Sequence, residues 1–182
     1  LDLFMYIFAE SGAIVNVNNV TVLERNMLDY CDLQLLNKLK EKAIELISQV
    51  PNIPTDTKKI DVRTGLLYIS IPGIDATDEQ RNDFIMLNNK LNIKEHILNE
   101  LKLIDCLNKF EILYGGQVGI SVSPKGFNKS MAMDFLIKNK LQYKHQHTFS
   151  DCVVPGTKTR LKFDFFIPKF NLGIEYDGEQ HF

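Results

Sequence analysis

The sequence lacks several features that mark specialised classes of protein. It contains only three cysteines, Cys31, Cys106 and Cys152, and their wide spacing fits neither a disulfide framework nor paired zinc ligands. It shows no internal repeat and no low-complexity run, which argues against a disordered chain. The scarcity of cysteine predicts a reducing compartment inside the cell, and we expect a cytoplasmic protein.

An excess of one charge and a long hydrophobic run are also missing. The formal net charge is -2 over 182 residues, so binding to nucleic acid or an acidic membrane would require a local patch. The apolar opening, "LDLFMYIFAESG", contains Asp2, lacks a basic flank and is too short to span a bilayer. We therefore expect a buried strand there and no membrane partner. The first residue is not Met and the last follows His181 directly, which suggests a fragment cut at both ends.

The composition is that of a globular protein, with 45% hydrophobic and 24% charged residues. This length allows one good core, or one domain and part of another. Apolar residues at spacings of three and four predict a helix over about 28–50. Thr77 with Gln80 forms a capping-box pattern, which predicts a helix from about Asp78 to Leu91. Asn18 and Asn19 tolerate the positive φ angles of a tight hairpin.

Strand pairs alternate with helix pairs along the first two thirds of the sequence. Strand pairs are expected in "KKIDVRTGLLYISI", turning at Thr64 and Gly65, and in "FEILYGGQVGISVS", and a further helix over 93–104. This order predicts an α+β fold, an antiparallel sheet with helices on one face, rather than a parallel doubly wound sheet. We place a domain boundary near Lys129, which gives domains 1–129 and 130–182.

Two arginines are the first candidate for a binding site. Arg63 precedes a predicted strand, and Arg81 lies in the first turns of the capped helix. A guanidinium can grip a phosphate through two charge-assisted hydrogen bonds. The alternative is that both are solvated surface residues, as most charged side chains are.

Residues 4–130 resemble a known family. The resemblance is carried by "YIFAESGAIV", "DVRTGLLYISIPG", "TDEQRNDF" and "YGGQVGISVSPKGFNK", which are similar to the cap domain of eukaryotic-type phosphomannomutases of the haloacid dehalogenase superfamily. It implies a cap that binds hexose phosphate, with Arg63, Arg81 and Lys129 at the sugar phosphate, and a homodimer formed through the cap. It also implies a core with Mg²⁺ and a nucleophilic aspartate, which together exchange phosphate between positions 6 and 1 of mannose.

The sequence departs from that family's pattern at three cap positions. Ile74 stands where the family has a further arginine, and Gly119 and Ser121 stand where it has a serine and an aspartate. Loss of these groups predicts weaker sugar-phosphate binding. The aspartate motif would lie upstream of Leu1, so we expect this fragment to be inactive as a mutase. A non-catalytic binding module is a third hypothesis.

The last fifty residues suggest a different chemistry. Asp164 and Glu175 lie on two apolar segments joined by "PKFN", and antiparallel pairing of these segments would bring the two carboxylates together. Mg²⁺ prefers such oxygen ligands and can activate a water molecule. The alternative is that both carboxylates point into solvent.

Residues 131–182, which include "LKFDFFIPKFNLGIEYDGEQHF", are similar to endonuclease domains of the restriction-endonuclease fold related to very-short-patch repair nucleases. This resemblance implies a partial α/β unit that cleaves DNA with Mg²⁺. It implies catalytic roles for Asp164, Glu175 and His181 and metal ligation by Asp164, Glu175 and Asp177, with Gln180 nearby.

A further metal hypothesis concerns "YKHQH". His145 and His147 are two residues apart on a predicted strand, with Cys152 following. These three residues could bind a transition metal, but zinc sites usually show four ligands at recognisable spacing. His96, within a predicted helix, is expected at the surface.

Overall fold

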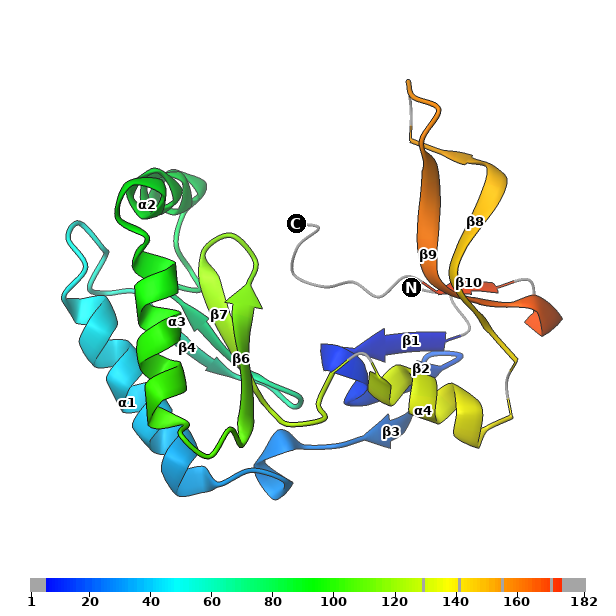
Figure 1. The fold of residues 1–182 in the computed structure, drawn as a ribbon, viewed down its shortest axis with the longest axis horizontal. Coiled ribbons are helices and arrows are strands. Elements are labelled where there is room, and N and C mark those ends of the chain that lie inside the picture. The colour runs from blue at the N-terminus through cyan, green and yellow to red at the C-terminus, as the bar shows by residue number, and fades with distance from the viewer. Residues whose placement is uncertain (1–5, 129, 141, 155, 171, 175–182) are drawn as a thin grey trace. The chain divides into compact units, whose positions relative to one another are not determined.

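The computed structural model describes residues 6–128, 130–140, 142–154, 156–170 and 172–174. The chain divides into two compact units. Residues 25–128 form one unit, and the described residues of 6–24 and 130–174 form the other. Figure 1 shows the helices and strands of both units.

A four-stranded antiparallel sheet is the centre of the 25–128 unit. Its strand order is β4-β5-β7-β6, and every neighbouring pair is antiparallel. The strands are β4 (Ile60–Val62), β5 (Leu67–Ser70), β6 (Phe110–Gly115) and β7 (Gly119–Pro124). The expectation of an antiparallel sheet is confirmed, and the arrangement is compatible with a cap of the haloacid dehalogenase type.

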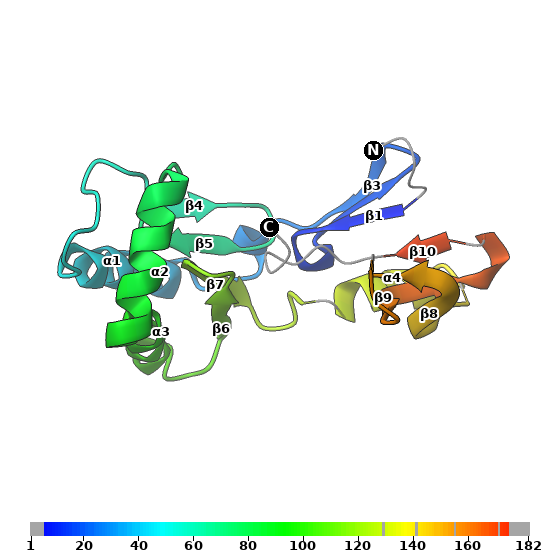
Figure 2. The same ribbon diagram turned by 90° about the horizontal axis from the view of Figure 1, so that it is seen from above.

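Three helices lie on one side of this sheet, as Figures 1 and 2 show. They are α1 (Leu33–Ser48), α2 (Asp78–Leu91) and α3 (Ile93–Ile104). Helix α1 begins later than the predicted residue 28 because Asp32 caps it: the Leu35 N–H donates to Asp32 Oδ1 over 3.1 Å. Residues Met27–Asp29 form the short 3-10 helix η2 instead.

The predicted capping box at α2 is confirmed. The Gln80 N–H donates to Thr77 Oγ1 over 3.2 Å, and the Thr77 N–H donates to Gln80 Oε1 over 2.9 Å. Asn92 separates α2 from α3 with a left-handed backbone, φ 51°, a conformation that asparagine tolerates better than most residues. The chain therefore changes direction between the two helices within one residue.

The two faces of the sheet differ in chemistry because side chains alternate along each strand. Leu67, Ile69, Ile120 and Val122 are fully buried and belong to the face that the helices cover. Tyr68 and its cross-strand neighbours Asp61 and Ser121 point to the other face. That second face is therefore the polar one.

Lys59 connects the loop before β4 to the loop after β5 by hydrogen bonds. Lys59 Nζ donates to the carbonyl oxygens of Pro54, over 2.6 Å, and Pro72, over 3.0 Å, and to Thr57 Oγ1. Burial lowers the pKa of the Lys59 ammonium from its usual value. The loop before β4 is thus held to the loop that follows β5.

The second unit contains two three-stranded antiparallel sheets and one α-helix. The sheet orders are β1-β2-β3 and β10-β9-β8. The elements are β1 (Tyr6–Ala9), the 3-10 helix η1 (Glu10–Gly12), β2 (Ile14–Val17), β3 (Val20–Glu24), α4 (Ser130–Lys138), β8 (Lys144–Val153), β9 (Arg160–Ile167), the 3-10 helix η3 (Pro168–Phe170) and β10 (Leu172–Ile174). The predicted hairpin is confirmed, with φ 48° at Asn18 and 63° at Asn19.

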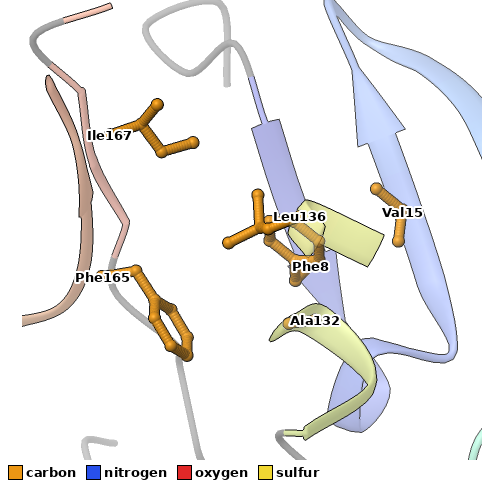
Figure 3. Packing of buried hydrophobic residues seen from close by; sticks show 6 residues of the cluster. All are labelled: Phe8, Val15, Ala132, Leu136, Phe165 and Ile167. Atoms are coloured by element: carbon orange, nitrogen blue, oxygen red, sulfur yellow. The ribbon is translucent and has the colours of Figure 1, made fainter. Parts of the chain in front are cut away.

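Helix α4 joins the two sheets of this unit through one hydrophobic cluster. Figure 3 shows its buried members, which come from β1, β2, α4 and β9: Phe8, Val15, Ala132, Leu136, Phe165 and Ile167. Gly12 allows η1 to approach α4 closely, since a Cβ on Gly12 would lie 2.9 Å from the Ala132 backbone nitrogen. Strands distant in sequence therefore share one core.

This core changes the domain division expected from the sequence. We expected domains 1–129 and 130–182, with the opening strands part of the cap. Residues 6–24 instead group with the described residues of 130–174, because Phe8 and Val15 are buried against α4 and β9. The described residues of 130–174 therefore share one core with residues 6–24, and a partial endonuclease domain is not shown.

None of the helices formed by the described residues is long and apolar enough to cross a membrane.

Replacing Leu136, a buried leucine of this cluster, tests whether residues 6–24 and the described residues of 130–174 form one unit. Leu136 is fully buried, so Leu136→Ala should cost about 2–5 kcal/mol. Hydrogen exchange followed by mass spectrometry should show lost protection in residues 6–24 and 142–170 together, with 25–128 unchanged. The matched variant Leu39→Ala, in the buried face of α1, should instead reduce protection in residues 25–128 and leave 6–24 and 142–170 unchanged. Unchanged exchange in 6–24 on Leu136→Ala would contradict the grouping.

The partly buried Lys59 predicts that the free energy of unfolding depends on pH. Because its pKa is lowered in the folded chain, the unfolded chain binds more protons between that lowered pKa and the ordinary value of about 10.4. The contribution of Lys59 to the free energy of unfolding should therefore rise with pH across this interval. Urea unfolding from pH 8 to 10 should show this rise, and Lys59→Met should reduce it. If the free energy of unfolding rises equally with pH in the unaltered chain and in Lys59→Met, Lys59 does not cause the rise.

Candidate functional site

Arg63 lies where β4 turns into β5, beside the polar face of the sheet. Its backbone N–H donates to the Leu66 carbonyl over 2.9 Å, which closes a tight turn at Thr64 and Gly65. Its side-chain Nε donates to Asp61 Oδ2 over 2.9 Å. The guanidinium carbon lies 5.0 Å from the centroid of the Tyr68 ring, within the range of a cation–π contact. The arginine is therefore held by a carboxylate and an aromatic ring.

Asp61 is the anionic partner in this arrangement. Its Oδ1 also accepts a hydrogen bond from Lys58 Nζ over 3.1 Å. The hydrogen bond from Arg63, and next that from Lys58, hold the pKa of the Asp61 carboxyl below its usual value. Asp61 is therefore ionised at neutral pH and fixes the plane of the Arg63 guanidinium.

The Tyr68 ring lies against β7. Its hydroxyl donates to the Gly115 carbonyl over 3.3 Å, and its ring covers Gly119. A Cβ on Gly119 would lie 2.5 Å from the tyrosine hydroxyl oxygen and 2.6 Å from two ring carbons. Gly119 is one of the three departures from the family pattern, and the ring position explains it, because a serine would collide with Tyr68.

Arg81 has a different set of partners. Its Nε donates to the Ala76 carbonyl over 3.1 Å, and its Nη2 donates to the Ile74 carbonyl over 2.8 Å. The guanidinium therefore braces the loop that enters α2. The acceptor at Ile74, a second departure from the family pattern, is its backbone carbonyl, which any residue at this position would supply, and nothing in the structure explains the isoleucine side chain. The phosphate-binding role of Arg81 stays a prediction.

Two serines complete the polar face. Ser121, the third departure, pairs with Tyr68 on one side and Leu113 on the other. Ser70 is fully buried, and its Oγ has no hydrogen-bond partner among the described residues. A fixed cation such as Arg63 suits binding of an anionic ligand.

Sequence reasoning found Arg63 but missed Asp61 and Tyr68. Asp61 lies in β4 and Arg63 directly follows that strand, two residues on, so extended backbone places both side chains on one face. The strand pairing then places Asp61 opposite Tyr68. Alternation along the predicted hairpin around Thr64 and Gly65 would have revealed all three residues on one face.

Several sequence-based candidates are not described by the structure. Asp164 lies in β9, but its side chain is not among those described. Lys129 and the terminal candidates lie outside the described residues: Glu175, Asp177, Gln180 and His181. Strands β9 and β10 pair antiparallel, with Ile174 opposite Phe165, as the carboxylate hypothesis required of the two segments.

The hypothesis of a transition-metal site is not supported. The His145 ring packs against Phe165, with centroids 5.5 Å apart, and the His147 ring stacks on Phe166 at 4.5 Å. Phe165 and Phe166 are consecutive in a strand and point to opposite faces. Across the part of the chain that the structure describes, no three His, Cys, Asp or Glu residues are grouped to hold a metal ion. The expected Mg²⁺ ligands Asp164, Glu175 and Asp177 are not among the side chains that the structure describes, so the Mg²⁺ site stays a prediction.

Three relatives have sequences similar to this chain. The phosphomannomutase of Babesia bovis is 29% identical over 143 residues, which are 76% of this chain and 57% of the relative. That of Saccharomyces cerevisiae is 23% identical over 175 residues, 95% of this chain and 66% of the relative. Human phosphomannomutase 1 is 24% identical over 156 residues, 86% of this chain and 59% of the relative.

The chain thus spans less than two thirds of the length of these relatives. The family model described as eukaryotic phosphomannomutase matches residues 1–168. This match includes most of the segment that the sequence alone likened to an endonuclease. Because it covers far more than half of the sequence, the chain belongs to the eukaryotic phosphomannomutase family of the haloacid dehalogenase superfamily.

Proposed function

We propose that this phosphomannomutase-like chain binds a hexose phosphate on the polar face of the β4-β5-β7-β6 sheet, with Arg63 at the phosphate. The observation that carries the proposal is the fixed position of Arg63 between Asp61 and Tyr68, inside the family match. Arg81 and Lys129 are proposed as further phosphate contacts, on the resemblance of their sequence context.

The geometry supports binding for a physical reason. The Arg63–Asp61 hydrogen bond uses Nε and is only partly exposed to solvent. An arginine held in this way loses little side-chain entropy when a ligand arrives. A charge-assisted hydrogen bond to phosphate is stronger than a neutral one, so one such arginine can dominate the affinity of a small anionic ligand.

The mutase reaction itself is a proposal for the whole protein. The phosphomannomutases that resemble this chain are named for exchange of phosphate on mannose, a reaction that needs a carboxylate nucleophile and a divalent metal in one site. The expected Mg²⁺ ligands Asp164, Glu175 and Asp177 are not among the described side chains. The Mg²⁺ requirement, a homodimer through the cap and a cytoplasmic location stay predictions.

Titration with mannose 1-phosphate tests the binding proposal. By isothermal calorimetry the unaltered chain should bind saturably, and Arg63→Gln should weaken the affinity roughly tenfold to a hundredfold, about 1.5–3 kcal/mol for a hydrogen bond to a charged group. Arg160→Gln, an exposed arginine of β9, is the matched control and should bind normally. Equal affinity of the Arg63 and Arg160 variants would exclude Arg63 as the phosphate contact.

A second candidate function, Mg²⁺-dependent DNA cleavage by residues 130–182, is favoured by a local charge. Residues 138–169 contain seven lysines and arginines and only two aspartates, in a chain of net charge -2. Lys158, Arg160 and Lys162, at the turn and start of the β8–β9 hairpin, are exposed. Such a basic segment would attract the phosphates of a duplex.

Cleavage of supercoiled plasmid with and without Mg²⁺ tests this second function. If it is correct, nicking should require Mg²⁺ and should be lost in Asp164→Asn, because the proposed metal ligand is then neutral. Asp134→Asn, an exposed aspartate of α4, should retain full activity. Plasmid left intact by the unaltered chain over a range of Mg²⁺ concentrations would remove the nuclease proposal.

A further inference from the structure

We infer that Tyr68 is a positioning residue for Arg63, and that Gly119 is present so that the tyrosine ring can take this position. The inference deepens the proposed function and rests on it, because the arginine it positions is the proposed phosphate contact. It concerns Arg63 at the β4–β5 turn, Tyr68 in β5 and Gly119 in β7, three residues that no sequence pattern had connected.

The ring of Tyr68 has contacts on several sides. Beneath it lies the Gly119 backbone, where a Cβ would come within 2.6 Å of ring carbons. The Arg63 guanidinium lies against the ring, 5.0 Å from its centroid. At its far end, the hydroxyl donates to the Gly115 carbonyl. The ring therefore acts as a spacer that sets how far the guanidinium stands from β7.

Gly119 is required by this spacer. Its position follows the β6–β7 turn and faces Ser70 of β5 across the sheet. Any side chain at position 119 would push the ring outward, since the nearest atoms include ring carbons of a side chain anchored at its hydroxyl. Displacement of the ring would move its contact with Arg63 as well. Positions 68 and 119 should therefore affect the arginine as one coupled pair.

Two anchors fix the guanidinium in different ways. Asp61 fixes it by a hydrogen bond to Nε, which sets direction, and Tyr68 fixes it by contact with the aromatic face, which sets height above the sheet. Loss of either anchor should leave the arginine present but misplaced. The expected result is weaker phosphate binding with little change in the fold.

The experiment compares four variants by two measurements. The first is the affinity for mannose 1-phosphate by calorimetry. Tyr68→Leu should weaken it roughly three- to tenfold, from loss of a cation–π contact, and Tyr68→Phe should stay within about twofold because it keeps the ring. Gly119→Ala should weaken binding in the unaltered background but not in the Tyr68→Leu background, since the collision is then gone.

The second measurement does not need a ligand. The Arg63 Nε–Hε resonance in a ¹H–¹⁵N spectrum should carry a ring-current shift that disappears in Tyr68→Leu, persists in Tyr68→Phe and changes in Gly119→Ala. Tyr114→Leu is the matched control, because Tyr114 is an exposed tyrosine that contacts Lys94 instead. It should leave the resonance in place.

The two measurements separate the two proposals. If the unaltered chain binds no sugar phosphate, the proposed function fails, and the Arg63 resonance still decides whether Tyr68 positions the arginine. If the resonance and the affinity are the same in Tyr68→Leu as in the unaltered chain, the inference about Tyr68 is wrong. If Gly119→Ala and Tyr68→Leu are fully additive, the coupling between the two positions is wrong.

Discussion

One-sided burial of the β4-β5-β7-β6 sheet is the constraint on which the candidate site depends. The helix-covered face buries four residues completely: Leu67, Ile69, Ile120 and Val122. Because side chains alternate along each strand, Tyr68 and Ser121 must lie on the opposite face. The polar groups meet on the second face because the hydrophobic residues between them are buried on the first. Register and hydrophobic burial together therefore assemble the site.

Two of the three departures from the family pattern, Gly119 and Ser121, lie on this sheet beside Tyr68. Gly119 accommodates the ring of Tyr68. The carbonyl of Ile74 accepts a hydrogen bond from Arg81. Ser121 is a cross-strand neighbour of Tyr68. Gly119 and Ser121 are thus connected through Tyr68, whereas the Ile74 contact uses only the backbone. The face retains a fixed cation at Arg63.

The core of the second unit is built differently, because it combines residues from distant parts of the chain. Helix α4 buries Ala132 and Leu136 against β1 and β2 on one side and β9 on the other. A continuous stretch of sequence was therefore a poor guide to this unit. The family match to residue 168 agrees with a single family running through both units.

The sequence by itself determined the local structure: the capping box at Thr77, the asparagine hairpin turn, the helices and the strand pairs. These features depend on backbone conformation and side-chain periodicity within a few residues, which are written in the sequence directly. Only the tertiary structure decided that Asp61 and Tyr68 hold Arg63, that Arg81 braces a loop, and that the first strands join α4. These outcomes depend on strand register and on contacts between residues up to about 150 positions apart in the chain, and such contacts are selected by the packing of the whole core.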